Sequence, residues 1–286
     1  MRLTWIAGVT PDEQSFKILK AALEAGVNVW NGADFYGTPD NNSLHLMKRY
    51  FTAYPEDAEK REQKFRDGKK KIDIFGCGRV DKKVPIEETV AALAQLVQEG
   101  KIGGIQLSEV SADTIRRAAK VTKIDMVEAE ISLWSRDVFQ NGVAETCAEL
   151  GITMVAHTPL GAGMLTGHIK SLDDMPANSY HRHFPRFQPE NIDVNFQLVA
   201  KLKEMAEAKG CTPAQLALSW IKTQSSRPHM PLFVPVAGAR SEERVTENVK
   251  DVHLSEGDLQ AIQLILDDST VAGDRYPPAA AVLTEY

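Results

Sequence analysis

The sequence contains few cysteines, and those present do not form a recognisable set. Cys77, Cys147 and Cys211 are an odd number of thiols without Cys-x-x-Cys spacing. This usage argues against a disulfide framework and a zinc site, and it is typical of a reducing compartment. Apolar runs near the ~18 residues of a membrane span are also missing, and residues 1–6 lack the apolar core of a signal peptide. We therefore expect a cytoplasmic protein without a membrane anchor.

An excess of positive charge is missing as well. The formal net charge is -6, and the one short basic cluster, residues 69–71, is typical of a solvated loop or helix end. Nucleic acids and anionic membranes are therefore not expected as partners. His181 and His183 stand one residue apart, without an obvious cysteine or carboxylate partner nearby. We accordingly expect no metal site.

Apolar residues make up 43% of the chain and charged residues 25%, close to the averages of a globular protein with a sizeable core. The length of 286 residues permits one large α/β domain or two smaller ones. Composition alone therefore excludes no fold class, and the fold class has to be predicted from the order of helices and strands.

Helices that end at a glycine and lead into a short apolar run recur along the chain. Gly26 precedes residues 27–30, Gly100 precedes 102–107 and Gly151 precedes 152–156. This alternation predicts a parallel sheet covered by helices. Because no Gly-x-Gly-x-x-Gly follows a strand, a closed barrel is favoured over an open dinucleotide-binding sheet. Strands are expected near Val27, Ile72, Ile102, Met126, Thr153 and Leu232.

These strands are fewer than the eight that a (β/α)8 barrel needs. Residues 54–71 are polar where a strand and its helix would stand, and little sequence precedes Thr10. We therefore expect an α/β fold of the (β/α)8 TIM-barrel type, in which strand 1 and the third strand–helix unit are missing or degenerate. Helix caps are predicted at Thr10, Ser111, Thr212, Ser241 and Ser255.

Several segments in chain order carry residues that would lie at the carboxyl ends of such strands, where barrels place their chemistry. Residues 30–37 read Trp-Asn-Gly-Ala-Asp-Phe-Tyr-Gly, and residues 78–81 read Gly-Arg-Val-Asp. The other segments are 100–109, 128–136, 156–167 and 234–248. Together they resemble the ordered motifs of the aldo-keto reductase family, nearest to its fungal pyridoxal reductase-like branch. The resemblance implies a single barrel domain over residues 1–286.

The resemblance also implies a reaction. Tyr36 would donate a proton to the developing alkoxide while the nicotinamide transfers a hydride. Asn31 stands where the family has an aspartate, and Gly78 stands where it has a histidine. The family lysine that brings the tyrosine pKa towards neutrality has no match, so Lys60 and Lys64 are candidate substitutes. The alternative interpretation of Tyr36 is an aromatic side chain packed under a loop.

An NADPH site is implied in the same way. Ser108 would bind the nicotinamide carboxamide, with Glu109 and Glu128 where amides usually assist. His157 would stack on the nicotinamide, or it is an ordinary buried histidine. Two arginines at a helix start suit a 2′-phosphate and so favour NADPH over NADH. The residues implied for the pyrophosphate and the adenosine phosphate are Pro159, Leu160, Gly161, Gly238, Arg240, Arg244, Glu247 and Asn248.

Three hypotheses follow for the function. The first is an NADPH-dependent reductase of an aldehyde or ketone, with pyridoxal or the carbonyl of a secondary metabolite as its small-molecule substrate. The second is a catalytically silent barrel that binds NADPH and acts through protein interaction, because the aspartate, lysine and histidine positions are all unmatched. The third is a truncated family member that is not stably folded, since an opened barrel exposes strand edges.

Overall fold

The computed structural model describes residues 2–5, 8–62, 72–175, 177 and 179–286. The chain divides into two compact units, each with a hydrophobic core of its own. The smaller unit comprises Met1–Lys70 and Val236–Lys250, and the larger unit comprises Lys71–Pro235 and Asp251–Tyr286. The single domain expected over residues 1–286 stays a prediction.

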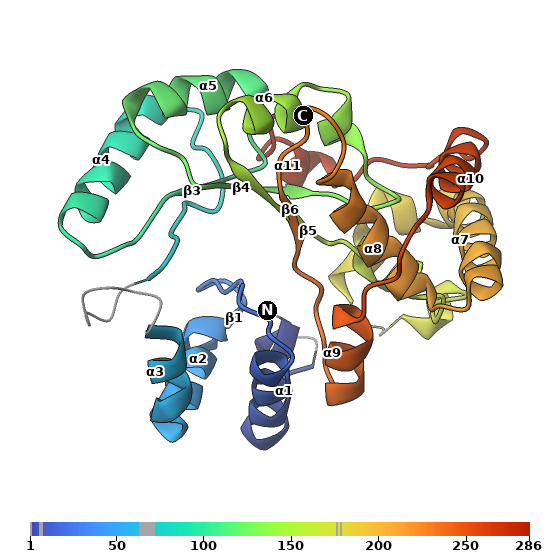
Figure 1. The fold of residues 1–286 in the computed structure, drawn as a ribbon, viewed down its shortest axis with the longest axis horizontal. Helices are drawn as coiled ribbons and strands as arrows, with labels where there is room; N and C mark the ends of the chain where they lie inside the picture. The colour runs from blue at the N-terminus through green and yellow to red at the C-terminus, as the bar shows by residue number, and fades with distance from the viewer. Residues whose placement is uncertain (1, 6–7, 63–71, 176, 178) are drawn as a thin grey trace. The chain divides into compact units, whose positions relative to one another are not determined.

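The larger unit is built on a four-stranded parallel sheet in the order β3-β4-β5-β6 (Figure 1). Its strands are β3 (Gln106–Ser108), β4 (Met126–Glu130), β5 (Thr153–His157) and β6 (Phe233–Pro235). The register pairs Ser108 with Glu128, and Glu130 with His157. Because the strands are parallel, their carboxyl ends share one edge of the sheet, where a ligand site is expected in α/β folds.

Helices connect the consecutive strands, as parallel pairing requires. The larger unit contains α4 (Ile86–Gln98), α5 (Ala112–Val121), α6 (Val143–Glu149), α7 (Pro189–Lys209), α8 (Pro213–Gln224), α10 (Glu256–Asp267) and α11 (Pro278–Ala281). The predicted caps are confirmed here: Ser111 Oγ accepts from Thr114 N at 3.2 Å, and Ser255 Oγ accepts from Asp258 N at 3.2 Å. Thr212 and Gln215 cap each other reciprocally at the start of α8.

The core of the larger unit lies between the sheet and these helices. Val127 and Met154 of the strands are fully buried, as are Val90 of α4 and Ile115 of α5. Burying each such side chain contributes roughly 1.5–3 kcal/mol relative to exposing it. The carboxyl edge of the sheet is thereby fixed on a rigid scaffold, and its loops carry short 3-10 helices. These are η2 (Asp137–Phe139), η3 (Gly161–Thr166), η4 (Leu172–Asp174), η5 (Tyr180–His183) and η6 (Pro185–Phe187).

The smaller unit is mostly helical. It contains η1 (Arg2–Thr4), α1 (Asp12–Glu24), α2 (Ser43–Ala53), α3 (Pro55–Glu62) and α9 (Glu242–Val249), with a two-residue hairpin of β1 (Gly37–Thr38) and β2 (Asn41–Asn42). Tyr50 of α2 is fully buried and donates its hydroxyl to Asp57 of α3 at 2.7 Å. Arg49 makes a two-point contact with Asp12 of α1. The predicted Ser241 cap of α9 is confirmed by its bond from Arg244 N at 3.3 Å. The predicted Thr10 cap is wrong, because α1 begins one residue later than expected, with Pro11 at the cap position and no side-chain bond.

Two of the six expected strands are not formed as predicted. Residues 27–30 are not a strand, because Trp30 is covered by the ring of Phe51 in α2, at 5.6 Å between centroids, instead of by a neighbouring strand. The segment near Ile72 makes only isolated parallel bridges, from Ile72 to Ile102 and from Phe75 to Ile105. The apolar run at 27–30 therefore predicted a buried strand, whereas Trp30 is half-buried and packs on a helix. The expected strands near residues 102, 126, 153 and 232 are confirmed, the first of them beginning at Gln106.

Candidate functional site

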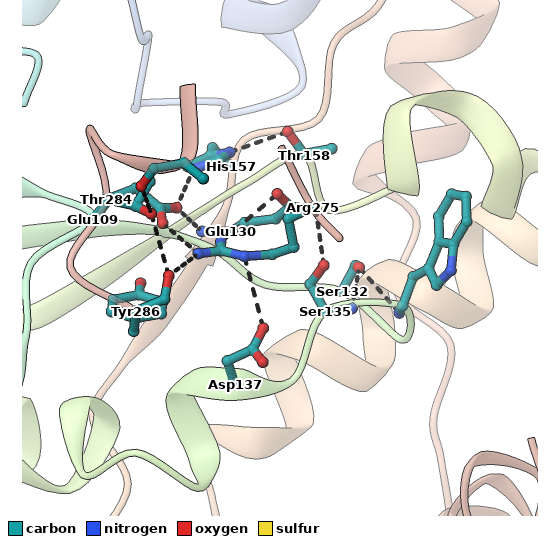
Figure 2. Close-up of polar contacts among 12 residues, drawn as sticks. Glu109, Glu130, Ser132, Ser135, Asp137, His157, Thr158, Arg275, Thr284 and Tyr286 are labelled. Atoms are coloured by element: carbon teal, nitrogen blue, oxygen red, sulfur yellow. Dashed lines mark hydrogen bonds and ion pairs between the residues drawn. The ribbon is translucent and has the colours of Figure 1, made fainter. Parts of the chain in front are cut away.

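The carboxyl ends of β3, β4 and β5 carry a buried group of charged side chains (Figure 2). Glu109 follows β3, Glu130 ends β4 and His157 ends β5. Arg275, from the segment after α10, lies among them. The sequence motifs predicted that these three strand ends lie side by side. In the structure, Glu109 is hydrogen-bonded to both of the other strand ends.

Glu109 is the centre of this group, and both of its carboxylate oxygens are occupied. Oε1 accepts from Glu130 N at 2.7 Å and lies 2.7 Å from His157 Nε2, while Oε2 accepts from Arg275 Nη2 at 2.9 Å. A carboxylate only accepts, so His157 Nε2 carries the proton of that contact. The side chain of Glu109 is 0% exposed. Its backbone φ of 54° is rare for a residue with a Cβ and costs about 1–2 kcal/mol, which these bonds offset.

The charges in this group shift each other's ionisation. Burial alone would raise the pKa of Glu109, but the hydrogen bond and charge of His157, together with Arg275, lower it to about 2. Burial alone would lower the pKa of His157, but the bond to Glu109 and the nearby carboxylates raise it overall. The structure therefore holds Glu109 as an anion and favours the protonated, cationic form of His157.

A pH dependence of stability follows from these two shifts. The raised His157 pKa contributes stability that is fully present below about pH 6.5 and is lost as pH rises through the folded value. The depressed Glu109 pKa contributes stability above about pH 4.5 that is lost as pH falls towards about 2. We expect His157→Gln to flatten the decline in melting temperature of the wild type above about pH 6.5. Equal slopes for the two proteins in melts across this range would contradict the assignment.

A second layer of the group was not anticipated from the sequence. Glu130 Oε1 accepts from Ser135 Oγ at 2.8 Å, and Arg186 Nη1 donates to the same hydroxyl oxygen at 2.7 Å. Arg275 Nη1 lies 3.8 Å from Glu130 Oε2, and Arg275 Nε lies 3.8 Å from Asp137 Oδ2. Arg186 and Arg275 belong to none of the recognised motifs. The only sequence signal for them is that a strand ending in glutamates needs cations if it is to be buried.

Ser108 and Glu128, the other residues predicted at the nicotinamide carboxamide, are bonded within the protein. Ser108 Oγ accepts from Arg79 Nη1 at 2.7 Å. Glu128 Oε2 accepts from Gln106 Nε2 at 2.6 Å. Arg79, the residue beside Gly78, therefore brings a cation to this edge of the sheet, where the family pattern has histidine one residue earlier.

The turn predicted at the pyrophosphate follows β5. Pro159 is buried, Leu160 is half-buried, and Gly161 begins η3. The Gly161 N–H donates to Thr158 O at 2.9 Å. A Cβ on Gly161 would stand 2.6 Å from Trp134 Cε3, and its φ of 54° favours glycine. Tight packing on Trp134 is thus one physical reason for the glycine, independent of any ligand.

The predicted catalytic residues Asn31 and Tyr36 lie in the smaller unit, in the loop between α1 and β1, and both are half-buried. The Tyr36 ring lies 4.7 Å from that of Phe35 and 5.9 Å from that of Trp5. Its backbone carbonyl accepts from Thr4 Oγ1 at 2.6 Å and from Ser43 N at 3.1 Å. Two hydrogen bonds to its carbonyl oxygen therefore hold the backbone at this tyrosine in place.

The predicted adenosine-phosphate residues also lie in the smaller unit. Gly238 and Arg240 are exposed, and Arg240 Nη2 donates to Gly8 O at 2.9 Å. Arg244 forms an ion pair with Glu247, and Asn248 is half-buried in the same helix, α9. Arg240 precedes the first turn of α9 and Arg244 lies in it, and at that end the helix dipole favours an anion.

Two further predictions concern lysine and metal. Lys60 lies in α3 but its side chain is outside the described part, and Lys64 lies outside the described residues altogether. Among the side chains that the structure describes, no group of three or more histidines, cysteines, aspartates or glutamates is placed to hold a metal ion. No helix in the described part of the chain has the length and apolar character needed to cross a membrane.

Comparison with known proteins gives one consistent family. The model of the aldo/keto reductase family matches residues 1–67 and 66–267. A probable pyridoxal reductase 2 of Schizosaccharomyces pombe is 32% identical over 311 aligned positions, covering 96% of this chain and 92% of that protein. An aldo-keto reductase, str7, of Strobilurus tenacellus is 34% identical over 302 positions, covering 97% and 88% of the two chains.

Solved structures show the same fold at lower identity. Glycerol dehydrogenase AKR11B4 from Gluconobacter oxydans aligns with a TM-score of 0.77 at 19% identity, covering 97% of this chain and 91% of that one. A thermostable aldo-keto reductase, Tm1743, aligns with a TM-score of 0.65 at 20% identity, covering 92% and 93%. The α/β architecture expected from the sequence thus matches known structures of this type.

Proposed function

The chain belongs to the aldo/keto reductase family of NAD(P)H-dependent oxidoreductases, and from that membership we propose that it reduces an aldehyde or ketone with NADPH. The observation that carries the proposal is Tyr36, which matches the family tyrosine in the sequence motif and whose carbonyl oxygen accepts hydrogen bonds from the Thr4 hydroxyl and the Ser43 N–H. NADPH, when bound, supplies the hydride. The phenol of Tyr36 donates its proton to the carbonyl oxygen as negative charge develops there.

The adenosine-phosphate end of NADPH fits the smaller unit. Arg240 is exposed and Arg244 is half-exposed, and both stand at the start of α9 with Ser241 as its cap. Two guanidinium groups at a helix N-terminus suit a 2′-phosphate dianion. Glu247 and Asn248 on the same helix are proposed to contact the adenine.

The nicotinamide end fits less well in the arrangement that the structure shows. Ser108, Glu109 and Glu128 are proposed for the carboxamide, and His157 for the nicotinamide face, but Glu109 has no exposed side-chain surface. Its two oxygens are already bonded to Glu130, His157 and Arg275. In this arrangement the Glu109 carboxylate is not accessible to a ligand.

The proposed substrate is a small carbonyl compound. A pyridoxal-like aldehyde is supported by the similarity to the probable pyridoxal reductase of Schizosaccharomyces pombe, and a carbonyl of a secondary metabolite is the other candidate. We propose that the protein acts in the cytoplasm. The test is to purify the chain, titrate NADPH by its fluorescence, and follow NADPH consumption with pyridoxal and a panel of aldehydes and ketones. Binding without consumption of NADPH for every carbonyl would overturn the catalytic proposal.

A non-catalytic NADPH-binding protein is the second candidate function. It is favoured by one observation: Asn31 and Gly78 replace an acid and a histidine of the family pattern. Without an aspartate and its lysine, the pKa of a phenol stays far from neutrality. Such a protein would bind NADPH and melt cooperatively but show no turnover, whereas a chain that neither binds nor melts cooperatively would be a truncated, unstable member.

The choice between NADPH and NADH gives a separate prediction. Arg240→Ala is expected to raise the Kd for NADPH by about 10- to 100-fold, because a charge-assisted hydrogen bond contributes about 1.5–3 kcal/mol. The Kd for NADH should not change, since that cofactor lacks the 2′-phosphate. Lys250→Ala, which removes an exposed cation just after α9, is the matched control. Equal losses for both cofactors would refute a 2′-phosphate contact.

A further inference from the structure

The segment after α10 returns to the carboxyl edge of the sheet in the larger unit. We call residues 275–286 the C-terminal strap; it includes α11. Glu285 N donates to Glu109 O at 3.1 Å, and Glu285 Oε2 accepts from Ser111 N at 2.7 Å. The strap is thus hydrogen-bonded to the backbone on both sides of residue 110, directly after β3.

Arg275 joins the two ends of the strap to Glu109. Its Nη2 donates both to Glu109 Oε2 at 2.9 Å and to Tyr286 O at 3.0 Å. Its guanidinium lies over the ring of Tyr286 at 5.0 Å and over that of Tyr276 at 5.3 Å. Figure 2 shows Tyr286, Thr284 and Arg275 gathered around Glu109 and His157. Arg275 therefore links the two ends of the strap to each other, and it also binds the Glu109 carboxylate that is proposed to contact the cofactor.

Two features indicate that the closed strap holds the groups proposed for the nicotinamide. The side chain of Glu109 is 0% exposed, so a ligand reaches it only after Arg275 or the strap backbone has moved. Both ring nitrogens of His157 are also hydrogen-bonded within the protein: Nε2 lies 2.7 Å from Glu109 Oε1, and Nδ1 lies 3.0 Å from Thr158 Oγ1. A neutral carboxamide cannot replace a guanidinium at a buried carboxylate without a loss of electrostatic energy.

We propose that the C-terminal strap is an autoinhibitory element, which in its closed state occupies the nicotinamide subsite through Arg275 and Glu109 and which NADPH must displace. This inference rests on the proposed function, because it assumes that NADPH binds at the carboxyl ends of β3, β4 and β5. The strap residues Glu285 and Tyr286 set the closed population without touching the reacting atoms. Weakening their contacts shifts the equilibrium towards the open state.

The test uses the full chain with two strap contacts removed, Glu285→Ala together with Tyr286→Ala. If the strap is closed in about nine molecules out of ten, opening it lowers the apparent Kd for NADPH about tenfold, because the competent fraction rises from about one tenth towards one. The control is Val282→Ala, which changes a strap residue that is 60% exposed. It should leave the affinity unchanged.

Trypsin supplies a readout that does not depend on activity, since it cleaves after Arg275. Release of residues 276–286 is expected to be faster in the double variant than in the wild type, and faster in the wild type with saturating NADPH than without it. Protection of Arg275 by NADPH, or equal or weaker NADPH binding by the double variant, would overturn the proposal. If neither the wild type nor the variant binds NADPH, the proposed function fails; if both bind it equally, only the strap proposal fails.

Discussion

Replacing Tyr36 by phenylalanine is expected to lower kcat by about 10²- to 10⁴-fold, the usual contribution of a positioned general acid. Tyr36 is the proposed general acid, and neither Asn31 nor Gly78 could replace its phenol as a proton donor. The ring contacts with Phe35 and Trp5 survive the change, and the melting temperature should therefore stay close to that of the wild type. Steady-state kinetics with the best carbonyl of the panel measure the effect.

The matched control is Tyr54→Phe, which removes a phenol in the same unit. The Tyr54 ring packs on Phe16 and Tyr50, and Tyr54 lies at none of the predicted site positions, so the loss of its hydroxyl should leave kcat unchanged. NADPH affinity should be the same in both variants. If Tyr36→Phe retains the full kcat, Tyr36 is the packed aromatic of the alternative interpretation, and another group is the acid.

Replacing Arg275 by methionine is expected to destabilise the protein by about 3–5 kcal/mol, the cost of leaving a buried charge without its partner. Both side chains of the Arg275–Glu109 pair are buried, at 9% and 0% exposed. Methionine keeps much of the aliphatic length but leaves Glu109 Oε2 without a donor. Urea unfolding would measure the change in the free energy of unfolding.

A double-mutant cycle separates the pair from the general loss of an arginine. Glu109→Gln combined with Arg275→Met should cost less than the sum of the two single changes, by about 0.5–3 kcal/mol, because the double variant no longer leaves one member of this pair charged without the other. Arg116→Met is the control, since Arg116 pairs with Glu149 on the surface, and its loss should cost less than about 1 kcal/mol. Strict additivity of the two buried changes would show that Arg275 and Glu109 are not coupled.

Local rules were sufficient for much of the fold. The caps at Ser111, Thr212, Ser241 and Ser255 depend only on a side-chain oxygen three residues before a backbone N–H, so the sequence shows them directly. Apolar runs near residues 126 and 153 became β4 and β5 because both faces of a parallel strand are buried. The run at 27–30 shows the limit of this rule, since Trp30 is half-buried and packs on the rings of Tyr50 and Phe51 in α2.

For the candidate site too, the sequence predicted some of the features and the structure alone showed the others. Motif order identified Ser108, Glu109, Glu128 and His157 as neighbours at the carboxyl edge of a sheet, and the register of β3, β4 and β5 places them there. The sequence could not show that Glu109 is already bonded to Arg275. That contact joins positions 166 residues apart, and no local pattern encodes such a pairing.

The sequence determined the aldo-keto reductase pattern and the parallel order of strands, because both depend on residue identity and short spacing. It also predicted Tyr36 as the catalytic tyrosine, with Asn31 and Gly78 at the aspartate and histidine positions and no match for the lysine. Only the tertiary structure decided how the buried charges are compensated. Burial makes an unpaired carboxylate costly, so Glu109 takes its partners from wherever the folded chain supplies a cation. Its partners here are His157, at the end of β5, and Arg275, in the C-terminal strap.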